Sequence, residues 1–129
     1  VDGVEGHSVL CRLLDYDTLA LLGSLIEAQP RMLDASSPRV AWRPEGGFVA
    51  AWDAHGDNVD GEKGGVQVQA FSAVGTPAGP RRMANRHGVG EQHVGFVLPV
   101  SRLRTWVGWY GPEPQRDDLG VRVRDLGPF

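Results

Sequence analysis

The sequence has one cysteine, one lysine and no long apolar run. Cys11 has no partner for an intrachain disulfide, which excludes a disulfide scaffold and favours a buried free thiol. No apolar segment approaches the roughly 18 residues of a membrane-spanning helix, so we expect no membrane span. The formal net charge is −3 at pH 7, which argues against a dedicated nucleic-acid binder.

Recognisable catalytic motifs are also missing. The sequence has no serine nucleophile elbow, no P-loop and no GxGxxG, and its four histidines form no zinc pattern with Cys11. We therefore expect no enzyme. A hydrolase that uses a pair of carboxyl groups stays as a third alternative.

Glycine and proline are abundant. The 18 Gly and 9 Pro among 129 residues interrupt the chain too often for long helices. Short segments rich in Val and aromatic residues lie between them, which is typical of strands. The segment 18–28 also fits a helix, but Gly23 and the repeat described next favour a strand. The expected strands span 8–14, 20–28, 38–43, 47–53, 65–72, 78–84, 92–98, 104–110 and 119–126.

An internal repeat organises these strands. Residues 66–71 resemble residues 121–126, 55 positions later, and residues 9–14, 57 positions earlier. Residues 47–52 likewise match residues 104–109 with an offset of 57. A period of this length, with about four short strands in each unit, is typical of a β-propeller blade.

The best-preserved copy resembles a repeat of large secreted bacterial proteins. Residues 46–53 read GGFVAAWD, and residues 65–79 read GVQVQAFSAVGTPAG. They are similar to the pattern GGFVVxW…DG…GVxxQxFxxxGxPxG, whose copies are thought to form propeller-like blades. The resemblance is best over residues 38–85. It implies an all-β fold and an extracellular or cell-surface location in a bacterium, and it carries no catalytic residues.

The expected architecture is a single domain, 1–129, of two units (8–64 and 65–118) followed by an extra strand (119–129). Two units do not close a propeller, which takes about 4–8 blades. We therefore expect propeller-like blades that are completed by a homo-oligomer or by other chains. The alternative is a compact β-barrel or sandwich.

The acidic stretch 53–63 contains a candidate calcium site. Asp57, Asn58 and Asp60 place oxygen ligands close together around a glycine turn, and oxygen is the ligand that Ca²⁺ prefers. The alternative is a solvated hairpin turn, because Asp, Asn and Gly are the usual turn residues. The sequence requires no cofactor, and calcium is the one metal that it suggests.

Four tryptophans and one arginine are candidates for ligand binding: Trp106, Trp109, Trp42, Trp52 and Arg104. Indole rings beside Arg groups can hold sugar rings, and small propeller lectins assembled from two-blade chains have a similar plan. The alternative is that the tryptophans pack between blades. Trp52 and Trp109 are repeat-equivalent, which favours packing, whereas Trp106 replaces Val49 and is the better ligand candidate.

These observations give two main functional hypotheses. The first is a non-enzymatic module that binds a ligand or partner, with carbohydrate as the ligand to test first. The second is a structural or assembly subunit of a larger secreted or surface complex, without a small ligand. The oligomeric state in solution bears most directly on both hypotheses.

Overall fold

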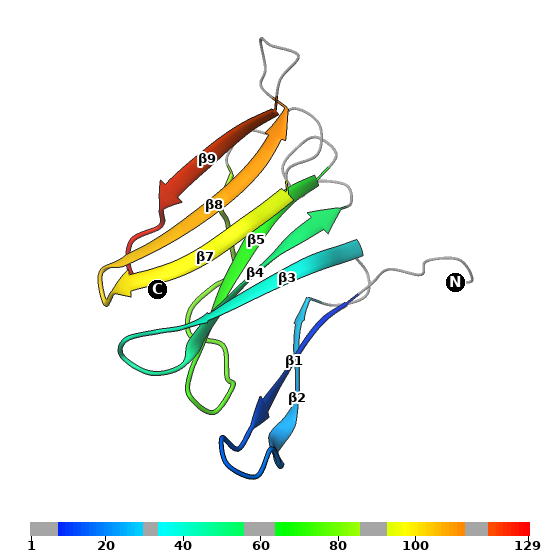
Figure 1. Cartoon of the computed structure of the whole chain (residues 1–129), viewed down its shortest axis with the longest axis vertical. Helices are drawn as coiled ribbons and strands as arrows, with labels where there is room; N and C mark the ends of the chain where they lie inside the picture. The colour runs from blue at the N-terminus through cyan, green and yellow to red at the C-terminus, as the bar shows by residue number, and fades with distance from the viewer. Residues whose placement is uncertain (1–7, 30–33, 56–63, 86–92, 113–118) are drawn as a thin grey trace, which may run out of the picture.

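The computed structural model describes residues 8–29, 34–55, 64–85, 93–112 and 119–129. These residues form nine strands and no helix, so the expected all-β class is confirmed (Figure 1). No segment within those ranges is a helix able to cross a membrane. The strands are β1 (Val9–Leu14), β2 (Leu21–Gln29), β3 (Asp34–Trp42), β4 (Phe48–His55), β5 (Gly64–Phe71), β6 (Arg82–Met83), β7 (His93–Ser101), β8 (Arg104–Pro112) and β9 (Leu119–Asp125).

The strands form three antiparallel sheets, none of which is closed. They are the β1–β2 hairpin, a central sheet in the order β3-β4-β5-β6, and a C-terminal sheet in the order β7-β8-β9. Within each sheet the strands pair in the order in which they follow one another along the chain, as is usual for antiparallel strands. The predicted units, 8–64 and 65–118, divide between β4 and β5, whereas the hydrogen-bonded sheets begin at β3 and β7.

Two segments differ in instructive ways from a regular strand. The segment 18–28 contains no helix: its residues from Leu21 onward belong to β2, with Gly23 at a φ of 73°. The strand expected over 78–84 shortens to β6, because Pro77 and Pro80 have no backbone N–H to give to a ladder. Ala78 instead donates its N–H to the carbonyl oxygen of Ala70, which keeps this segment against β5.

The central sheet is covered on both faces, and β4 shows how the sequence achieves this. Phe48, Ala50 and Trp52 point toward the β1–β2 hairpin, whereas Val49 and Ala51 point toward the C-terminal sheet. All five side chains are buried. Successive side chains of a strand point to opposite faces, so a strand packed on both faces has a continuous apolar sequence. The run FVAAW is that sequence.

The repeat determines which face each tryptophan occupies. Trp52 lies in the cluster that joins the central sheet to the hairpin, and Trp109 lies in the cluster that joins the C-terminal sheet to the central sheet. Each therefore points toward the sheet that precedes its own in the chain. Trp52 and Trp109, which are 57 residues apart, therefore occupy equivalent positions in two successive interfaces between sheets.

Polar contacts also join the central and C-terminal sheets. The buried Asp53 of β4 accepts a hydrogen bond from the backbone N–H of Val94 at 2.5 Å. The Nδ1 atom of His93 lies 3.1 Å from the other carboxylate oxygen. Arg82 of β6 donates to the carbonyl oxygen of Leu126 at 2.6 Å, beyond the end of β9. These contacts fix the two sheets in one relative position.

Candidate binding surfaces

The structure separates the four candidate tryptophans. Trp52 is fully buried and Trp109 is 6% exposed, so both pack between sheets. Trp42 is 69% exposed and lies at the end of β3, edge-on to Phe48, with ring centroids 6.1 Å apart. Trp106 is 39% exposed on β8, in the C-terminal sheet. Trp42 and Trp106 are thus the two tryptophans that a ligand can reach, and they do not share a site.

The candidate calcium ligands Asp57, Asn58 and Asp60 lie outside the described residues. Within the described ranges, no group of three or more His, Cys, Asp or Glu side chains is placed to hold a metal ion.

The outward face of the C-terminal sheet is apolar and uncovered, and we call it the open face. Cross-strand pairing places Leu98 beside Trp106 and Tyr110 beside Val121, with all four side chains on this face. Between 37% and 77% of each side chain of the open face is exposed. Its apolar residues are Phe96, Leu98, Trp106, Tyr110, Val121 and Val123.

Gly108 shapes the middle of the open face. The ring of Phe96 lies where a side chain at Gly108 would be, so the absence of a Cβ atom lets the ring lie directly against β8. Trp106 and Tyr110 flank this position on the same face of β8. The ring of Tyr110 in turn lies 5.3 Å from the ring of His93. Aromatic rings therefore cover the length of the strand.

Arg104 lies at the start of β8, close to the open face. Its Nε atom is 3.5 Å from a carboxylate oxygen of Asp125, and both side chains are substantially exposed to solvent. An ion pair this exposed contributes little to stability. The guanidinium group is therefore available to a ligand or partner at this end of the open face.

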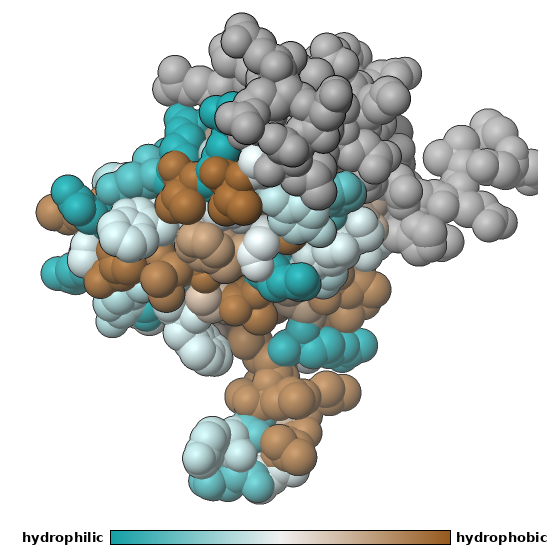
Figure 2. All heavy atoms as spheres, turned by 45° about the horizontal axis from the view of Figure 1, so that its top comes forward, coloured by the Kyte–Doolittle hydropathy of each residue, from teal (hydrophilic) through white to brown (hydrophobic). Residues whose placement is uncertain are grey.

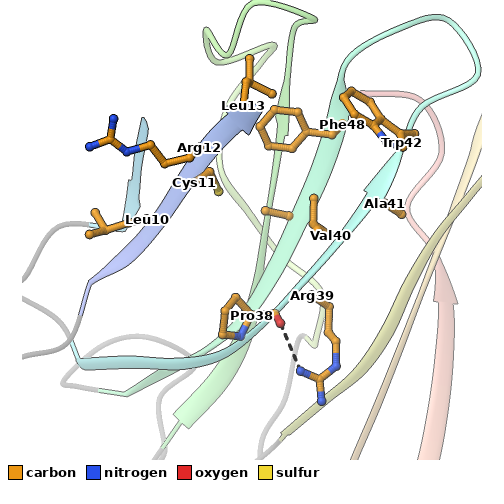
Figure 3. Close-up of a pocket in the computed structure, with 11 residues that line it drawn as sticks. Leu10, Cys11, Arg12, Leu13, Pro38, Arg39, Val40, Ala41, Trp42 and Phe48 are labelled. Carbon is orange, nitrogen blue, oxygen red and sulfur yellow. Dashed lines mark hydrogen bonds between the residues drawn. The ribbon is translucent and has the colours of Figure 1, made fainter. Parts of the chain in front are cut away.

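A second surface lies at the other end of the stack of sheets, and we call it the β1 groove. It is a cavity of about 400 Å³ between β1 and the strands β3 and β4 (Figure 3). Leu13 and Phe48 approach each other at one end, and Pro38 and Arg39 border the other. The residues around it are Leu10, Cys11, Arg12, Leu13, Pro38, Arg39, Val40, Ala41, Trp42, Phe48 and Ala50.

The β1 groove is apolar with a positive rim. Arg12 and Arg39 are its charged lining residues, and no carboxylate lines it among the described residues. Burial raises the pKa of the Cys11 thiol above its ordinary value, because desolvation disfavours the thiolate. The groove therefore favours apolar groups that carry a negative charge at their edge.

Sequence reasoning identified Trp106 and Trp42 as candidates but did not find the β1 groove or the place of Phe96. The signal for the groove was present in β1, whose sequence VLCRLL is apolar on both faces although one face alone is buried. The signal for Phe96 was Gly108, because a glycine within an aromatic strand indicates close approach by another group.

Comparisons with known proteins give no relative for this chain. No protein-family model matches the sequence, and neither the search of curated proteins nor the search of solved structures finds a match.

Proposed function

We propose that this chain is a non-enzymatic module of a β-propeller-like stack, and that its role is assembly with further sheets of the same kind. One observation carries the proposal. The open face has the same repeat positions as a face of the central sheet that is already covered by another sheet.

The equivalence can be followed residue by residue. Val49 and Ala51 pack under the C-terminal sheet, and the positions 57 residues later are Trp106 and Gly108 on the open face. Val66 and Val68 are covered in the same way, and the positions 55 residues later are Val121 and Val123. Positions of the central sheet that are covered by another sheet thus correspond to positions on the open face of the C-terminal sheet. A further sheet would bury the open face as the C-terminal sheet buries the central one.

A second copy of the chain is the partner that fits the open face. Its β1–β2 hairpin has an uncovered outward face formed by Leu10, Leu14, Leu21 and Leu25, each at least 45% exposed. Figure 2 shows hydrophobic side chains gathered on this projecting hairpin. This contact joins different surfaces of the two copies, so it is head-to-tail.

The segments that carry the two surfaces have opposite net charge, although Arg122 and Arg124 lie on the face of β9 turned away from the open face. Residues 8–29 carry three carboxylates and one guanidinium, a net charge of −2. Residues 93–129 carry five guanidiniums and four carboxylates, a net charge of +1. Opposite charge accelerates encounter and disfavours the alternative contact of two like surfaces.

The test is the molar mass in solution as a function of protein concentration. We expect the mass to rise with concentration, and Trp106→Asp to keep the chain monomeric because it places a carboxylate on the open face. Val74→Asp is the matched control, since Val74 is 78% exposed in the β5–β6 turn. A wild-type chain that stays monomeric at every concentration contradicts the proposal.

Carbohydrate binding is a second candidate function, supported by the arrangement on β8. Arg104, Trp106 and Tyr110 lie at alternating positions, so a guanidinium and two aromatic rings share one face. A glycan array followed by titration tests this candidate. Trp106→Ala should abolish sugar binding and Trp42→Ala should leave it unchanged, whereas a chain that binds no sugar contradicts the candidate.

A further inference from the structure

The β1 groove is bordered by a strand edge that lacks a partner. Among the described residues β1 pairs with β2 alone, so its other edge has no ladder. Four consecutive β1 residues, from Leu10 to Leu13, line the groove. Consecutive side chains point to opposite faces of a strand, so a groove lined by all four is bordered by the strand edge itself. That edge presents backbone N–H and C=O groups to an incoming chain.

We propose that the β1 edge and the β1 groove accept an extended strand from another polypeptide, with apolar side chains at alternate positions and a carboxylate among them. The backbone of the strand would extend the β1–β2 ladder, and its inward side chains would fill the groove. This proposal goes beyond the stacking role, because it concerns a strand edge rather than a sheet face.

The opposite side of the central sheet shows what such a strand would cover. There, β7 lies across both β3 and β4. On the hairpin side, β1 and β2 cover β4 and β5, but Val40 and Trp42 of β3 stay 66% and 69% exposed. A strand added to β1 would lie over these two side chains. It would bury them as β7 buries the other side of the sheet.

The edge of β3, which also borders the groove, is a poorer acceptor. Pro38 has no N–H to donate, and the pairing of β3 with β4 shifts register between Ser36 and Arg39. Ser37, inside this irregularity, has a φ of 53°. The register shift does not by itself separate the two strands, because the pairing of β1 with β2 also shifts register twice. The proline does, since a proline at an edge prevents strand addition. β1 contains no proline, so we assign strand addition to β1.

The charge at the groove selects the chemistry of the strand. Arg12 of β1 and Arg39 of β3 lie on its two sides. Opposite charges on directly neighbouring strands attract and like charges repel. An acidic strand is therefore favoured over a basic one.

The chain itself supplies a suitable probe, a peptide with the sequence FVAAWDAH of residues 48–55. In the chain this segment pairs with β5, which is the repeat equivalent of β1, and it carries one carboxylate, Asp53. We would titrate the peptide into the isotope-labelled Trp106→Asp variant, whose open face is disabled. Binding at β1 is then measured without association through the open face.

We expect saturable binding with slowed amide exchange at Cys11–Leu13. A peptide N-methylated at alternate residues should not bind, because it cannot donate to the ladder. Val40→Asp in the protein should weaken binding by about tenfold or more, equivalent to about 1.4 kcal/mol, whereas Val74→Asp should not. Replacing Arg12 and Arg39 by Glu should reverse the preference for an acidic peptide.

Two outcomes overturn the proposal. The first is the absence of peptide binding to the folded chain. The second is equal binding of the N-methylated peptide, which would make the groove a pocket for apolar groups rather than a strand acceptor. Neither outcome affects the concentration dependence of molar mass, so failure of this proposal is distinguishable from failure of the stacking role.

Discussion

Gly46 and Gly47 are adjacent in the β3–β4 turn and differ in what surrounds them. Both have positive φ values, 103° and 82°. A Cβ atom at Gly46 would meet nothing within 4 Å, whereas one at Gly47 would collide with the carbonyl oxygen of Phe71. Both positions therefore require glycine for their backbone conformation, and Gly47 requires it also because there is no room for a Cβ atom.

We predict that Gly47→Ala destabilises the protein more than Gly46→Ala. Both variants force alanine into a disfavoured conformation, at a cost of about 1–3 kcal/mol. Gly47→Ala must in addition separate the turn from β5. Urea unfolding of the two variants measures the difference in the free energy of unfolding. Equal losses would contradict the collision at Phe71.

Asp53 gives a second prediction at this scale. Its carboxylate is 2% exposed and accepts a hydrogen bond from the N–H of Val94 in the next sheet. Asp53→Ala leaves that buried N–H without its partner, so we expect a loss of about 1.5–3 kcal/mol in the free energy of unfolding. Asp125→Ala is the control, because its ion pair with Arg104 is exposed. A loss at Asp53 no larger than at Asp125 would show that the contact between sheets is unimportant.

Trp52 and Trp109 were candidates for ligand binding with packing as the alternative, and both are buried. Their equivalence in the repeat is the signal that favoured packing. Asp53 falls in the acidic stretch 53–63, and nothing in the sequence indicated that its side chain is buried. The reason is physical: the group that binds Asp53 is 41 residues away, and its position depends on how two sheets pack.

At the scale of elements, the strands were largely predictable and their partners were not. Gly, Pro and Asp residues bound most strands, and alternation within a strand is local, so the expected ranges agree with seven of the nine strands to within three residues at each end. β3 begins at Asp34, four residues before its expected start, and β6 is shorter than expected. The edge of β1 that has no partner among the described residues gives no local signal in the sequence. It depends on which strands are present beside it, and thus on the whole fold.

The thiol of Cys11 reports on this edge and gives a prediction of pH dependence. Burial raises the pKa of Cys11 in the folded chain, so the neutral thiol is favoured there. Alkylation by iodoacetamide should then reach half of its maximal rate at a higher pH in the folded chain than in urea. The associated stability is complete below the ordinary thiol pKa and is lost as the pH rises toward the higher folded value.

Mass spectrometry of the alkylated chain measures both pH profiles, and the urea-unfolded chain is the internal control. The probe peptide should slow the reaction in the folded chain, because Cys11 lines the groove that the peptide fills. Identical pH profiles for the folded and unfolded chain would show that β1 leaves its thiol in water.

At the scale of the molecule, the period of 55–57 residues predicted propeller-like blades, and it did not indicate where one hydrogen-bonded sheet ends and the next begins. Hydrogen bonding divides the described strands into sheets of two, four and three. The boundaries between these sheets determine which sheet faces stay open. The boundaries depend on hydrogen bonds between strands, and the repeat does not specify them. For this reason the open face was not predictable, although Trp106 on it was identified.

The proposed head-to-tail contact has a predictable salt dependence. Residues 8–29 carry a net charge of −2 and residues 93–129 a net charge of +1. Salt screens this attraction, with a Debye length of about 10 Å at 0.1 M and about 3 Å at 1 M. We expect the dissociation constant of the wild-type chain to rise between these salt concentrations, measured by sedimentation. A dissociation constant that is unchanged or falls would assign the contact to apolar packing alone.

The central sheet meets a different partner on each of its two faces, and this has a consequence for growth. A contact between identical surfaces is saturated once two molecules have met. A contact between two different surfaces, such as the open face of one copy and the hairpin of another, leaves one unused surface of each kind after every addition. The proposed stack would therefore have a direction, and it would end where the sheets close into a ring or where a sheet with a polar outer face acts as a terminator.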